Sequence, residues 1–274
     1  MKTILVPIDY SDSANNAAEY AIELSKTIKG KIILLHIYHV PLPTGEVPMF
    51  LISPEELEKN NLLKIKTFNK KLIKKTAGKV QIEYIVQSGF PSEEIIDMSR
   101  EIKPDIIVMG ITGSGKLGYN LIGSTTLDVK KKSKVAVLII PKKASFKQMK
   151  KIALAYNYSD SLKKEVRGNI KNIIHLLNAK LLVVNVVGSS KTLGLKNSTK
   201  KIKTDKALTG LKHTAYFIEG DSIDKEINFF IDTSKADWLI MMPHKYTFLK
   251  KLFHKSNTKQ MAFHTHIPLL AIHE

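Results

Sequence analysis

The stretch VMGITGSGKLGYNLIGSTT at residues 108–126 joins an apolar run to a series of glycines and hydroxyl residues. Gly110 is followed by two residues, then Gly113, then nine residues, then Gly123. Glycine lets a backbone approach a ligand closely and adopt positive φ, so that amide N–H groups are free to point inward. The stretch therefore predicts an anion-binding loop between a buried strand and a helix that begins near Gly123.

The same stretch contains Gly110, Gly115 and Lys116 in the spacing of a nucleotide-binding P-loop. A P-loop needs Ser or Thr directly after the lysine to hold magnesium, and here that residue is Leu117. This loop also follows the fourth apolar run of the chain, whereas a P-loop normally follows the first strand. Leu117 and the position of the loop in the chain thus argue against a P-loop. A glycine-rich loop that binds no ligand stays open as an alternative.

Short apolar runs alternate with longer amphipathic segments around this loop, as in the runs at 32–38, 105–110 and 135–140. Such alternation is typical of βαβ units, in which helices cover both faces of a parallel sheet. The sequence therefore predicts an α/β fold with a buried parallel sheet.

Helix boundaries are marked by residues with special backbone roles. Ser53 to Glu56 form a capping box with proline at the first helical position, and Gly78 stands where that helix should end. Gly30 is expected to close the helix that starts near residue 13. Pro91 is expected to open a third helix and Pro104 to end it.

The chain repeats its own pattern. TILVPIDYSDS at 3–13 opens the first half, and KIALAYNYSDS at 151–161 opens the second. Further apolar runs of the second half lie at 181–187, 237–243 and 267–272. Each half is therefore expected to be a five-stranded α/β unit, with the lysine-rich segment 141–151 as the link.

The G-x2-G-x9-G-[ST] spacing resembles the signature of the universal stress protein family. ILVPIDYSDSA near the start, LLHIY at 34–38, GFP at 89–91 and DIIVMG at 105–110 resemble that family in order and spacing. The resemblance implies two tandem doubly wound five-stranded parallel sheets of order 3-2-1-4-5, of the adenine nucleotide alpha hydrolase-like type, with helices on both faces. The domains would span 1–143, with an intact nucleotide loop, and 149–274, in degenerate form.

The resemblance further implies that the first domain binds ATP, with or without Mg²⁺, and acts as a nucleotide-dependent stress-response or signalling module. Asp9 would contact the ribose or base, and the backbone of Ile37 would pair with the adenine edge. A turn or helix-capping role is the alternative for Asp9. The expected nucleotide-binding residues are Pro7, Ile8, Asp9, Ile37, Met109, Gly110, Thr112, Gly113, Gly123, Ser124 and Thr125. No catalytic residue is expected, because no arginine finger or second acid accompanies Asp9, so hydrolysis would at most be slow.

The second half lacks the glycine spacing. Alignment of the closing runs places Met242, Lys245 and Lys255 opposite the three glycines, and Asn157 opposite Asp9. We expect this half to be a degenerate partner that pairs with the first within the chain, or to take part in a homodimer, with edge strands at the contact. An unidentified protein partner would respond to the nucleotide.

Composition leaves two other classes of function open. The formal charge of +18 is compatible with a polyanion or nucleic-acid binder, but only Arg100 and Arg167 are arginines among the basic residues. A second alternative is a metal or small-ligand site made by the histidines of the last quarter, His244, His254, His264 and His266.

The cysteine content and the lengths of the apolar runs bear on where the protein is located in the cell. The chain has no cysteine, which excludes disulfides and zinc–cysteine sites. No apolar run approaches ~20 residues, and the first residues do not resemble a signal peptide. We therefore expect a cytoplasmic protein.

Overall fold

Strands and helices alternate along the chain in a computed structural model, which describes residues 2–40, 53–111, 122–156, 162–187, 205–206, 208–242 and 266–272. The chain forms two compact units and passes from the first to the second between Lys142 and Lys143. The family domain boundaries expected at 1–143 and 149–274 remain a prediction.

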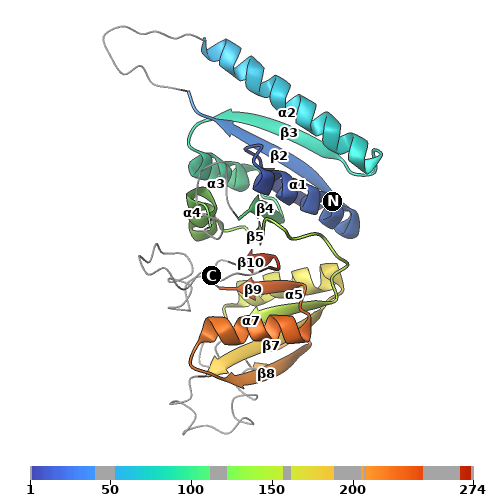
Figure 1. The fold of residues 1–274 in the computed structure, drawn as a ribbon, viewed down its shortest axis with the longest axis vertical. Coiled ribbons are helices and arrows are strands. Elements are labelled where there is room, and N and C mark those ends of the chain that lie inside the picture. The colour runs from blue at the N-terminus through green and yellow to red at the C-terminus, as the bar shows by residue number, and fades with distance from the viewer. Residues whose placement is uncertain are drawn as a thin grey trace, which may run out of the picture. The chain divides into compact units, whose positions relative to one another are not determined.

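The first unit contains a five-stranded parallel sheet of order β3-β2-β1-β4-β5, as the resemblance predicted (Figure 1). The centre of this sheet is apolar throughout: Ile4 and Leu5 of β1 and Ile107 of β4 are fully buried. Its strands are β1 (Lys2–Pro7), β2 (Gly30–Tyr38), β3 (Ile82–Ser88), β4 (Ile106–Gly110) and β5 (Val137–Ile140).

Four helices cover the two faces of this sheet. They are α1 (Asp12–Ile28), α2 (Pro54–Thr76), α3 (Pro91–Ile102) and α4 (Ser124–Lys132). Right-handed crossovers put α1 and α2 on one face, where the Glu19–Lys75 ion pair joins them. The chain then reverses direction across the sheet, so α3 and α4 lie together on the other face. The reversal makes the carboxyl ends of β1 and β4 the position where doubly wound sheets bind ligands.

Helix boundaries mostly follow the sequence signals, with one correction. The Ser53 hydroxyl accepts from the Glu56 amide at 3.2 Å, and α3 begins at Pro91 and ends before Pro104. Gly30, however, does not close α1: Lys29 takes the left-handed conformation with φ 51°, and Gly30 begins β2. Glycine is favoured at Gly30 because a Cβ there would lie 3.0 Å from the Lys2 carbonyl oxygen.

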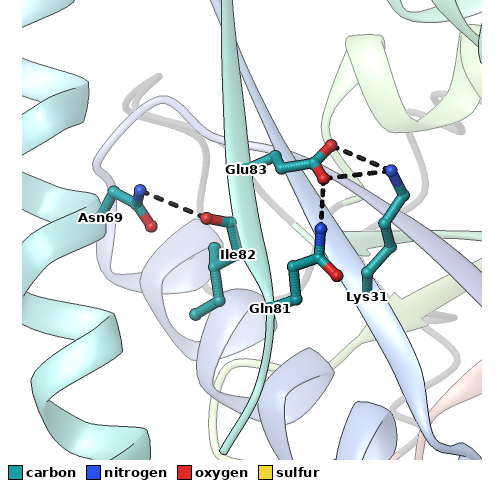
Figure 2. A network of polar contacts seen from close by, with 5 residues as sticks. All are labelled: Lys31, Asn69, Gln81, Ile82 and Glu83. Carbon is teal, nitrogen blue, oxygen red and sulfur yellow. Dashed lines mark hydrogen bonds and ion pairs between the residues drawn. The ribbon is translucent and has the colours of Figure 1, made fainter. Parts of the chain in front are cut away.

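Edge strand β3 is held by side chains from both directions (Figure 2). Glu83 of β3 forms an ion pair with Lys31 of β2 at 3.0 Å and accepts from Gln81 at 2.6 Å. From α2, the Asn69 amide nitrogen donates to the Ile82 carbonyl at 3.4 Å. These contacts tie β3 to the neighbouring strand β2 and to helix α2.

The second unit repeats the arrangement with the parallel order β10-β9-β6-β7-β8. Its largest fully buried side chains are Trp238 and Tyr156. The elements are β6 (Lys151–Ala155), α5 (Lys164–Leu177), β7 (Lys180–Val187), β8 (His213–Glu219), α7 (Ile223–Ser234), β9 (Trp238–Met241) and β10 (Leu269–Ala271).

The registers of the two sheets establish equivalent positions. Ile4 pairs with Ile106 as Ile152 pairs with Trp238, so Met242 is the equivalent of Gly110. The carboxylate before each fourth strand also repeats: Asp105 accepts from the Thr3 amide at 2.8 Å, and Asp237 accepts from the Lys151 amide at 2.9 Å. The sequence repeat is therefore a repeat of structure.

None of the helices in the described part of the chain is both long and apolar enough to cross a membrane.

Candidate functional site

The turn after β1 is organised by Asp9. Its Oδ1 accepts from the Ser11 amide at 3.0 Å and from the Ser11 hydroxyl at 2.6 Å. Ser11 in turn caps α1 by accepting from the Ala14 amide at 3.2 Å. Tyr10 lies between them with φ 63°. Asp9 thus has the turn role that the sequence left open, and it remains exposed at the carboxyl end of β1.

The backbone of Ile37 faces the same end of the sheet. Gly89 donates to the Tyr38 carbonyl at 3.0 Å, so even-numbered residues of β2 bond to β3. Ile8 donates to the Leu35 carbonyl at 2.9 Å, so odd-numbered residues bond towards β1. The β1 pairing ends at Leu35, and the N–H and C=O of Ile37 consequently point past the end of β1. We call this pair of backbone groups the open rung of the first unit.

The ladder stops there because a side chain takes the next acceptor. A further rung would join the Ile37 amide to the Ile8 carbonyl. In the structure, the buried His36 ring donates from Nδ1 to that carbonyl at 2.9 Å, and its Nε2 lies 3.0 Å from Asn61 Oδ1 on α2. We call the bond from His36 to the Ile8 carbonyl the carbonyl cap. Because the cap takes this acceptor, the open rung has no hydrogen-bond partner among the described residues.

Gly110 serves packing, which corrects one expectation. We expected positive φ at Gly110, but Gly110 is absent from the positive-φ residues of the described chain. The expected approach of its backbone to a ligand stays a prediction. A Cβ at Gly110 would lie 2.5 Å from Ser13 Oγ and 2.6 Å from the Ser13 carbonyl oxygen. The lack of a side chain therefore lets the first turn of α1 lie directly against the end of β4.

The amino end of α4 is anchored to that same strand end. Gly123 donates to the Ile111 carbonyl at 2.7 Å, and the Thr126 hydroxyl donates to the Gly110 carbonyl at 3.1 Å. Gly123 is the N-cap, and no described side chain caps this helix. The first amides of α4, at exposed Ser124 and half-buried Thr125, therefore suit an anion.

The other predicted residues contribute differently. Pro7 is half-buried and paired with Leu35, whereas the side chains of Ile8 and Met109 are buried in the sheet packing. Thr112 and Gly113 lie outside the described residues. The structure thus brings Asp9, the open rung and the α4 amino end to one end of the sheet.

Burial changes the acidity of one side chain next to this site. Desolvation raises the pKa of Tyr10 to about 12. The ring packs on His36 at 4.7 Å and on Phe68 at 5.7 Å, and its hydroxyl has no hydrogen-bond partner among the described residues. Tyr10 is therefore neutral at physiological pH and acts as packing beneath the turn.

The histidines of the second unit are only partly described. The Nε2 atom of His266 lies 3.2 Å from Oδ1 of Asp232, and His244, His254 and His264 lie outside the described residues. Within the part of the chain that is described, no three His, Cys, Asp or Glu side chains gather around a position for a metal ion.

Sequence reasoning missed three residues that build the site: His36, Ser13 and Thr126. His36 is a polar residue inside the apolar run IILLHIY, and a polar side chain in such a run needs a hydrogen-bond partner. That signal could have identified the carbonyl cap. Ser13 and Thr126 gave no comparable signal, because their roles depend on contacts across the fold.

The first half of the chain matches a known protein family. The model of the universal stress protein family matches residues 1–141 of the 274-residue chain, slightly more than half. The chain belongs to the universal stress protein family. Two universal stress proteins of Methanocaldococcus jannaschii are 33% and 31% identical to it, covering 53% and 52% of this chain and 97% and 82% of their own lengths.

A solved structure extends the likeness of fold to the whole chain. A universal stress protein from Archaeoglobus fulgidus covers 99% of this chain and 98% of its own, with a TM-score of 0.71 and 17% sequence identity. At that identity the likeness concerns the fold alone.

Proposed function

We propose that this universal stress protein binds ATP in its first unit and acts as a nucleotide-dependent stress-response or signalling module. The observation that carries the proposal is the juxtaposition, at one end of one sheet, of the open rung at Ile37 and the uncapped amino end of α4. An adenine edge offers an acceptor next to an amino group, which matches the N–H and C=O of one residue.

The phosphates would be held by the α4 end. The amides of Ser124 and Thr125 and their hydroxyls supply donors, and the helix dipole favours negative charge there. Asp9 would accept from the ribose hydroxyls, since its turn fixes the carboxylate at the exposed end of β1. Met109, Gly110, Pro7 and Ile8 would shape the site through the backbone, because their side chains are buried, half-buried or absent.

The proposal includes ATP binding without efficient ATP hydrolysis. Efficient hydrolysis needs a group that orients water and a positive charge at the transition state, usually with Mg²⁺. Asp9, the acid in the turn after β1, already accepts from Ser11. The nucleotide would therefore act by its presence, which a cytoplasmic protein partner would sense. Pairing of the second unit with the first, or of two chains, remains part of this proposal.

The test is to denature freshly purified protein and identify the released nucleotide and its stoichiometry by mass spectrometry. About one ATP per chain is expected. Gly123→Val should lower ATP affinity by about tenfold or more, because a branched side chain would crowd the α4 amino end. Gly168→Val is the matched control, since a side chain at Gly168 meets open space.

A folded protein that neither carries nor accepts adenine nucleotides would overturn the proposal. Binding of nucleic acid with a steep salt dependence and no preference for adenine would then favour the polyanion alternative.

A further inference from the structure

The second unit repeats the open rung. Tyr156 donates to the Val184 carbonyl at 3.0 Å, as Ile8 does to Leu35, and Lys180 donates to the Lys150 carbonyl at 2.8 Å. Even-numbered residues of β7 therefore face β6, whose pairing ends at Val184. The N–H and C=O of the half-buried Val186 point past the end of β6, as those of Ile37 point past β1.

The carbonyl cap is repeated as well, with different chemistry. Asn185 is equivalent to His36, and its Nδ2 donates to the Tyr156 carbonyl at 2.6 Å. Asn185 is only 3% exposed, and its Oδ1 is buried with no hydrogen-bond partner among the described residues. The assignment of the amide is fixed, because only Nδ2 can donate to a carbonyl. A buried acceptor without a donor costs free energy, so it points to a bound group.

The close packing that Gly110 allows in the first unit is not repeated in the second. Met242 stands where Gly110 stands, and it is fully buried. The helix also starts later: by register Lys164, where α5 begins, is equivalent to Asn16, whereas α1 begins at Asp12. The second unit therefore keeps the backbone that would pair with a base, whereas its sequence has Lys245 and Lys255 opposite the glycines of the phosphate-binding loop.

We propose that the second unit binds an uncharged adenine base or nucleoside at the carboxyl ends of β6 and β7. The Val186 amide would donate to the ring nitrogen beside the amino group. The Val186 carbonyl and Asn185 Oδ1 would accept the two amino hydrogens. The proposal uses the base-pairing geometry of the proposed function, but it concerns a different unit and a ligand without phosphates.

The experiment titrates adenosine into the full chain saturated with ATP and follows heat by calorimetry. The expected result is about one further adenosine per chain, with inosine at least about tenfold weaker, because inosine reverses the donor and acceptor on that edge. Asn185→His should weaken this binding by about tenfold while ATP still binds, since histidine can keep the carbonyl cap, as His36 does, but removes the oxygen that would accept the second amino hydrogen.

A second variant keeps the test decisive if Asn185→His fails to fold. Val186→Pro removes the open-rung N–H without removing a bond to β8, and it should abolish adenosine binding. No adenosine uptake by the ATP-saturated chain, or equal binding of inosine, would overturn the inference. Two ATP molecules per chain would overturn the exclusion of phosphates. If ATP does not bind at all, the proposed function fails. Adenosine titrated alone against wild type and Asn185→His then still decides the inference.

Discussion

Gly110 and Gly168 show how differently two glycines respond to the same change. Gly110→Ala would place a Cβ 2.5 Å from Ser13 Oγ and 2.6 Å from the Ser13 carbonyl, which is backbone and cannot turn away. We expect a loss of about 1–3 kcal/mol in the free energy of unfolding, measured by urea denaturation. An unchanged free energy would show that α1 does not need this close approach.

Gly168→Ala is the matched substitution. Gly168 lies inside α5, where a Cβ meets nothing within 4 Å. Replacing glycine by alanine in a helix interior should raise the free energy of unfolding by about 0.5–1 kcal/mol, because the unfolded chain loses freedom and the helix gains propensity. The same denaturation assay should therefore give opposite signs for the two variants. A loss at both positions would contradict the distinction.

The burial of Tyr10 predicts that the stability of the folded protein decreases at alkaline pH. Burial raises its pKa from 10.0 to about 12, so the folded state favours the neutral phenol. Its contribution to stability is complete below pH 10 and is lost as the pH rises towards 12. Tyr10→Phe should unfold at nearly the wild-type urea concentration near neutral pH, because the hydroxyl has no described partner. The variant should then lose less stability than wild type when denaturation is repeated near pH 11.

At the scale of elements, the start of each first strand is held by a carboxylate from the turn before the fourth strand. Asp105 forms an ion pair with Lys2 at 2.7 Å besides its bond to Thr3, and Asp237 accepts two backbone amides, those of Lys150 and Lys151. Asp105→Ala and Asp237→Ala should each lower the free energy of unfolding by about 1–2 kcal/mol.

A surface carboxylate provides the control for these two variants. Asp97 pairs with Arg100 one helical turn away, and both side chains are well exposed. Asp97→Ala should therefore change the free energy of unfolding by less than about 0.5 kcal/mol. Denaturation that does not distinguish Asp97→Ala from Asp237→Ala would show that the backbone bonds of Asp237 add nothing to an ordinary surface pair.

Element boundaries were predictable where a local cause determines them. The cap at Ser53 and the prolines around α3 act within one turn of chain, and the structure places them as expected. Gly30 was misassigned because it directly follows a helix, whereas the structural reason for glycine there is the nearby Lys2 carbonyl, which favours a residue without a side chain. That carbonyl comes from a neighbouring strand, which local sequence does not reveal.

At the scale of the whole molecule, the repeat was visible in sequence, while its chemistry was not. YSDS recurs, and the apolar runs keep their order, so two similar sheets could be predicted. The loss of glycines suggested a second unit that does not bind a nucleotide in the family manner. The runs at 32–38 and 181–187 align His36 with Asn185, but the shared role of the two residues becomes visible only in the structure, because each bonds to a carbonyl distant in sequence.

The separation into two units predicts where a nucleotide protects the chain. A ligand that binds only the folded first unit stabilises it by RT ln(1 + [L]/Kd), about 2.7 kcal/mol at a concentration 100 times Kd. Hydrogen exchange followed by mass spectrometry should therefore slow with ATP in peptides from 2–142 and change little in peptides from 143–272. Adenosine added to the ATP-saturated chain should slow exchange in β6 and β7. Equal slowing of both units by ATP alone would contradict this assignment, because it would require either a second ATP site or unfolding of the chain as one cooperative body.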